Sequence, residues 1–164
     1  MSTLLILTTL ETSLWMQVFG TFPSPSFWIP VLVYWSIYRS HKQGLFMAYL
    51  MAFIISPLTA LPLGMFLLTN LVLFEIAFFV RSRFYQPGVI YFTLVCGLIT
   101  FSLPIVLLLL SWLIENKPLK DLQVFALFMK PLLTMLVCIP LSYLFMYFDD
   151  KTDIALPTET GRQF

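Results

Sequence analysis

The chain has 164 residues, of which 60% are hydrophobic and only 10% are charged, and its mean hydropathy is +0.93. Because a water-soluble domain carries about a quarter charged residues, this composition excludes an ordinary soluble domain and predicts an integral membrane protein. The formal net charge of +1 provides no basic field suited to nucleic acid.

Six apolar segments are candidates for membrane-spanning helices, each of which needs about 20 apolar residues to cross a hydrocarbon core of about 30 Å. In chain order the predicted spans are residues 4–20, 27–38, 44–60, 64–80, 88–114 and 122–148. The second span reaches only about 18 Å, so aromatic residues at headgroup level or local thinning of the bilayer would have to accommodate it. We therefore predict an all-α membrane protein with a six-helix transmembrane domain over residues 1–148 and a polar cytoplasmic tail over residues 149–164.

The distribution of Lys and Arg predicts the orientation of this bundle. With both termini in the cytoplasm, the inner segments hold Arg39, Lys42, Arg81, Arg83, Lys151 and Arg162, whereas the outer segments hold Lys117 and Lys120. Because basic residues are enriched in cytoplasmic loops, we place both termini inside the cell. The amino-terminal segment has no basic residue before its apolar stretch and no Ala-x-Ala site, so we interpret it as a retained span.

Three charged residues lie inside predicted spans, namely Glu11, Glu75 and Lys130. Counted from the outer helix ends, all three lie about 12–17 Å deep. Isolated charges at this depth cost at least about 2.5–3.5 kcal/mol each, so we hypothesise that Lys130 pairs with Glu75 or with Glu11. This intramembrane polar cluster is either a structural polar lock, a proton or ion path, or a site that contacts a partner's transmembrane segment.

Small residues recur at every fourth position of the third span, at Gly44, Ala48, Ala52 and Ser56. Membrane helices associate through close backbone contact rather than through the hydrophobic effect, and small residues at this spacing allow it. The small-residue track, as we call these four residues, therefore predicts a helix-packing interface. It either holds the protein's own bundle together or docks a helix of a partner protein.

The sequence contains no Gly-rich phosphate loop, no Cys/His cluster and no recognisable nucleophile–base pair. Cys96 and Cys138 lie in separate apolar runs and are interpreted as small packing residues. His41 lies in a basic loop and is interpreted as a solvated surface residue. We therefore predict a protein that is not an enzyme and that uses no metal and no cofactor.

Residues 25–80 carry an ordered set of motifs. A Trp-x-Pro start in "FWIP" leads into "VLVYW", the basic loop "RSHKQG", a Gly-started helix with small residues, "LPLG", and an apolar helix closed by Arg. This order, over about a third of the chain, resembles the rod-shape-determining protein MreD family of the bacterial inner membrane. Val31 stands where the family often has an acidic residue, and "AFIISPLTALPLG" lacks the Asp that commonly ends the family's third helix. The resemblance is therefore to a diverged or MreD-like member.

The resemblance implies a six-helix fold similar to the substrate-binding components of energy-coupling-factor transporters. It also implies a non-enzymatic scaffold of the cell-elongation machinery that makes peptidoglycan. The implied partners are an MreC-like bitopic protein, a RodA-type glycosyltransferase with its penicillin-binding transpeptidase, and the MreB filament. Two alternatives remain open: a vitamin-binding transporter component that would use Thr59, Thr69, Asn70 and the first-loop serines, and an ion-conducting subunit that would use Glu11, Glu75 and Lys130.

Overall fold

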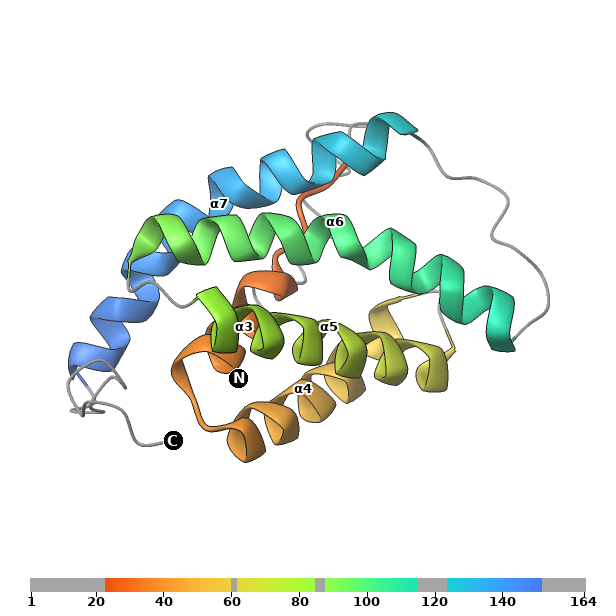
Figure 1. Cartoon of the computed structure of the whole chain (residues 1–164), viewed down its shortest axis with the longest axis horizontal. Coiled ribbons are helices and arrows are strands. Elements are labelled where there is room, and N and C mark those ends of the chain that lie inside the picture. The colour runs from red at the N-terminus through yellow and green to blue at the C-terminus, as the bar shows by residue number, and fades with distance from the viewer. Residues whose placement is uncertain (1–22, 60–61, 85–87, 115–123, 152–164) are drawn as a thin grey trace.

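The structure is a computed structural model that describes residues 23–59, 62–84, 88–114 and 124–151. This part of the chain is helical and contains no strand. Its elements are α3 (Trp28–Tyr38), α4 (His41–Ile55), the short 3₁₀ helix η2 (Ser56–Leu58), α5 (Leu63–Phe84), α6 (Val89–Ile114) and α7 (Val124–Lys151), arranged as shown in Figure 1. The predicted span 4–20, the outer Lys117 and Lys120, and the tail from residue 152 onward lie outside the described residues.

Three of these helices are long and apolar enough to cross a membrane: α5, α6 and residues Leu127–Tyr147 of α7. Each has large apolar side chains on its outer face, among them Leu68 and Phe79 on α5, Leu109 on α6 and Leu136 on α7. The described part of the chain is therefore all-helical, and the length and composition of its helices are those of a membrane protein. The six-span count stays a prediction, because α3 and α4 have only 11 and 15 residues.

Helix α3 lies at the centre of the described bundle and contacts α4, α5, α6 and α7. All of its residues except Trp35 are buried. A helix that is apolar on every side is stable only where apolar groups surround it, and an apolar run of 10–14 residues is typical of a buried core helix. Here the surroundings are other helices of the same chain, so the segment predicted as the second span forms the core of the bundle.

Polar contacts hold both ends of α3. At its start, the backbone N–H of Ser26 donates to Oγ1 of Thr134 on α7 at 3.1 Å, and that hydroxyl donates to the carbonyl oxygen of Lys130 at 2.8 Å. At its end, Nη1 of Arg81 on α5 donates to the carbonyl oxygens of Ser36 and Arg39 at 3.0 and 2.8 Å. The last carbonyls of a helix have no partner within the helix and carry a partial negative charge. Arg81 therefore caps α3 from a neighbouring helix.

Helices α6 and α7 form a closely packed pair along one side of α3 (Figure 1). The side chain of Met135 lies directly against the position where a Cβ of Gly97 would be. Cys96 and Cys138 are both fully buried and lie close to each other. The two cysteines are therefore packing residues, as the sequence predicts, and they lie together at one helix–helix contact.

Candidate functional site

The small-residue track lies on the inner face of α4. Gly44, Ala48 and Ala52 are buried and Ser56 is partly buried. A Cβ atom on Gly44 would lie 2.6 Å from Cε2 of Phe74 on α5 and 3.0 Å from the carbonyl oxygen of Trp35 on α3. The track thus lets α4 approach two helices of its own chain closely, which is the first of its two sequence interpretations. A partner helix would need a different surface.

The outer face of α4 has a different character. Phe46, Tyr49 and Phe53 follow one another at spacings of three and four residues, and all three side chains are exposed. Residues at this spacing share one face of a helix. The surface that α4 offers to lipid or to another protein is therefore aromatic, whereas its small residues are used inside the bundle.

The structure places Glu75 beside His41 and not beside Lys130. Oε1 of Glu75 lies 3.5 Å from Nε2 of His41, and the two side chains are 49% and 42% exposed. Lys130, which is partly buried on α7, forms no ion pair with Glu75, although the structure describes both residues. The Glu75 alternative for the predicted Lys130 pair is therefore wrong, and the other alternative involves Glu11, which lies outside the described residues.

His41 differs from its sequence interpretation as a solvated loop residue. It is the first residue of α4, its ring centroid lies 4.6 Å from that of Phe78 and 5.6 Å from that of Phe74, and its Nδ1 is buried without a hydrogen-bond partner. The predicted third helix began at Gly44, which left His41 outside it. Since α4 begins beside Phe74 and Phe78 of α5, counting depth along α5 alone did not show that His41 reaches Glu75.

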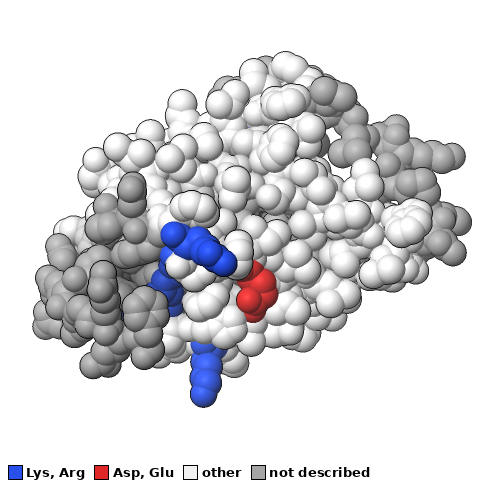
Figure 2. All heavy atoms as spheres, in the orientation of Figure 1, with Lys and Arg blue, Asp and Glu red and all other residues white. Residues whose placement is uncertain are grey.

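Four basic residues gather where α3 ends, α4 begins and α5 ends: Arg39, Lys42, Arg81 and Arg83. We call this set the basic end. Figure 2 shows blue basic side chains next to red carboxylate atoms on one part of the surface. The guanidinium carbon of Arg39 lies 5.7 Å from the ring centroid of Trp35, and that of Arg83 lies 5.8 Å from the ring centroid of Phe79. Aromatic and basic side chains of this kind are typical of the membrane–water interface.

The polar side chains proposed for recognition of a vitamin are used inside the protein. Oγ1 of Thr69 donates to the carbonyl oxygen of Met65 at 2.8 Å, Nδ2 of Asn70 donates to that of Phe66 at 3.0 Å, and Oγ1 of Thr59 donates to that of Ser56 at 3.1 Å. The two hydroxyls and the Asn70 Nδ2 therefore bond to the preceding turn, whereas Oδ1 of Asn70 is buried without a hydrogen-bond partner.

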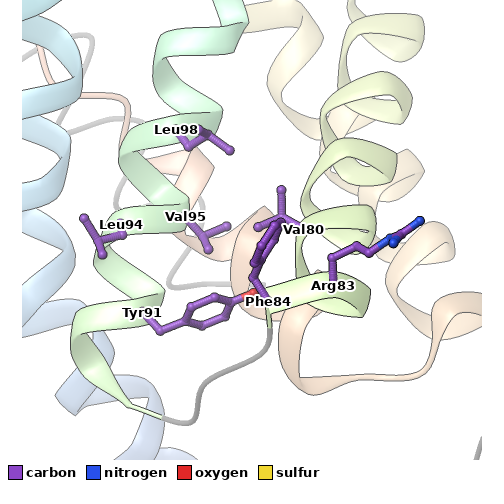
Figure 3. Close-up of a pocket in the computed structure, with 7 residues that line it drawn as sticks. All are labelled: Val80, Arg83, Phe84, Tyr91, Leu94, Val95 and Leu98. Atoms are coloured by element: carbon purple, nitrogen blue, oxygen red, sulfur yellow. The ribbon is translucent and has the colours of Figure 1, made fainter.

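An open groove runs between the last turn of α5 and the first turns of α6. Its volume is about 580 Å³, and its lining consists of Val80, Arg83, Phe84, Tyr91, Leu94, Val95 and Leu98. Figure 3 shows the guanidinium of Arg83 turned away from α6, so the charge stands at the rim and apolar side chains fill the space between the helices. Within the described residues, no three His, Cys, Asp or Glu side chains gather in a way that could hold a metal ion.

Comparisons of the chain with protein-family models, with curated proteins and with solved structures find no match. The resemblance of residues 25–80 to the MreD family therefore stays a prediction from the sequence.

Proposed function

We propose that this protein is a non-enzymatic membrane scaffold that binds other membrane proteins through the outer faces of its helices. The observation that supports this function is the contrast between the two sides of the helices. The interior is closed around α3, whereas the exposed side chains of α5, α6 and α7 are mostly large and apolar. Such faces contact lipid or other membrane helices.

The MreD-like order of motifs supports a place for this scaffold in the cell-elongation machinery of the bacterial inner membrane. Its partners are then an MreC-like bitopic protein, a RodA-type glycosyltransferase with its transpeptidase, and the MreB filament. Because Gly44, Ala48 and Ala52 of the small-residue track are buried inside the bundle, the partner contacts lie on outer faces such as the aromatic face of α4. Both termini lie in the cytoplasm in this proposal, with the basic end facing the same side.

Co-purification tests this function. The full-length chain, carrying an affinity tag, is extracted from bacterial membranes in a mild detergent, and its bound proteins are identified by mass spectrometry against an unrelated tagged membrane protein of similar size. We expect enrichment of membrane proteins of peptidoglycan synthesis, and cells depleted of the chain should lose their rod shape. Enrichment of transport ATPase components, or a bound small molecule with unchanged cell shape, would contradict the proposal.

A further inference from the structure

The outer face of α4 begins with one basic residue and continues with aromatic residues. Four of its residues follow one another at spacings of four, three and four positions: Lys42, Phe46, Tyr49 and Phe53. Residues at these spacings share one face of a helix, and all four are exposed. Gly44 packs against α3 and α5 on the opposite face. This row, which we call the α4 stripe, therefore points away from the protein's own bundle.

Glu75 stands beside the start of the α4 stripe, because α4 and α5 lie side by side (Figure 1). Its side chain is 49% exposed, and its Oε1 lies 3.5 Å from Nε2 of His41, the first residue of α4. Lys42 follows His41 and is turned about 100° from it around the helix, so the two side chains leave α4 in different directions. Among the described residues Glu75 forms an ion pair with His41 and none with Lys42. An exposed acid and an exposed base therefore lie at one level of the α4–α5 surface without pairing.

This level lies within the membrane-spanning length of α5. Glu75 is six residues, or about 9 Å, from Arg81 toward the middle of the helix. Ionisable residues inside membrane helices are costly and usually pair with one another. Lys42 can extend its long stem toward water, whereas the shorter side chain of Glu75 stays at this depth. The exposed carboxylate therefore favours a neighbour that brings a positive charge to the same depth.

We propose that a second copy of this chain supplies that charge, in a two-fold dimer formed through the α4 stripe. Copies with the same orientation in one membrane are related by a two-fold axis along the membrane normal, which keeps every residue at its depth. Since Lys42 and Glu75 lie at one level, this axis brings Lys42 of each copy to Glu75 of the other. The same surface carries the acid, the base and the aromatic rings, so it is complementary to itself. The outer faces of α6 and α7 remain for other proteins.

Charge exchange in the full-length protein tests this interface. Purified protein carrying either a donor or an acceptor fluorescent tag is reconstituted into phosphatidylcholine vesicles at a low protein-to-lipid ratio, and energy transfer between the tags reports dimers. We expect the dissociation constant of the dimer to rise by at least about tenfold in Glu75→Lys and in Lys42→Glu, because each variant places like charges opposite each other. The double variant Lys42→Glu/Glu75→Lys restores opposite charges and should recover the affinity of the unmodified protein.

Two matched controls separate the stripe from the rest of the surface. Arg83→Glu reverses a charge of the basic end that lines the groove on the α6 side of α5, and it should keep the dimer. Phe46→Ala should weaken the dimer, whereas Phe128→Ala removes a similarly exposed ring from α7 and should not.

A monomeric unmodified protein would overturn the proposal. So would a double variant no better than either single variant, or equal effects of the two Phe variants. No other protein is present in these vesicles, so a negative result here would leave the co-purification test of the scaffold function unaffected.

Discussion

At Gly44, any side chain would collide with the neighbouring helices, since a Cβ atom would lie 2.6 Å from Phe74 and 3.0 Å from the backbone of Trp35. We expect Gly44→Ala to lower the free energy of unfolding by about 1–3 kcal/mol, because inserting a methyl group into a filled core forces its neighbours to move. Gly64→Ala is the matched control, as nothing lies within 4 Å of its Cβ position. Unfolding by sodium dodecyl sulfate in mixed micelles measures both, and equal stability of the two variants would refute this view of α4 packing.

The cap that Arg81 places on α3 gives a second prediction for a single residue. Hydrogen bonds that involve a charged group contribute about 1.5–3 kcal/mol, so Arg81→Met should lower the free energy of unfolding by about 2 kcal/mol. Arg83→Met removes the same charge two residues away but no hydrogen bond to α3, and should change stability by no more than about 0.5 kcal/mol. The comparison is made in a zwitterionic detergent without anionic lipid. A loss of the same size in both variants would mean that charge, and not the cap, stabilises this end.

Helix α3 is the element on which the packing of the bundle depends. Leu32 on α3 is 1% exposed, whereas Leu136 on α7 is 68% exposed. Leu32→Ala should therefore lower the free energy of unfolding by about 2–5 kcal/mol, because it leaves a cavity among four helices. Leu136→Ala should stay within about 0.5 kcal/mol. Detergent unfolding again provides the measurement, and a mild effect of Leu32→Ala would show that α3 is not tightly enclosed.

For the helices as elements, the sequence predicted their positions along the chain better than it predicted how they pack against one another. Runs of apolar residues are a local signal, so α5 (Leu63–Phe84) and α6 (Val89–Ile114) lie close to the segments 64–80 and 88–114. The all-apolar character of α3 was compatible with lipid as well as with protein surroundings, and composition cannot distinguish the two.

The candidate site was predictable only in part. The spacing alone identified the small residues of α4 as a packing face. Whether this face packs against a partner or against the protein's own helices became clear only from the positions of Phe74 and Trp35 next to Gly44 in the structure. The pair of Glu75 with His41 depends on the relative level of α4 and α5, which no count along one helix provides. Arg81 looked like an ordinary basic residue at a helix end, and its role depends on where α3 ends.

For the whole molecule, the proposed orientation in the membrane can be tested at the basic end. Lys42→Cys places a thiol at the basic end and Pro62→Cys places one at the exposed start of α5, while the native Cys96 and Cys138 are buried. A membrane-impermeant maleimide added to spheroplasts should label Pro62→Cys and spare Lys42→Cys, since basic segments face the cytoplasm. In inverted membrane vesicles the pattern should reverse. Labelling of Lys42→Cys from outside the cell would reverse the proposed orientation.

The central proposal is that the protein acts through contacts made by its outer helix faces with other membrane proteins. Site-specific photocrosslinking in living cells tests it most directly, with a photoreactive phenylalanine analogue at the exposed Phe46, Phe53 and Phe128 and, as a control, at the buried Phe92. We predict crosslinks to membrane proteins of peptidoglycan synthesis from at least one exposed position and none from Phe92. Crosslinks to lipid alone from every exposed position would contradict the account.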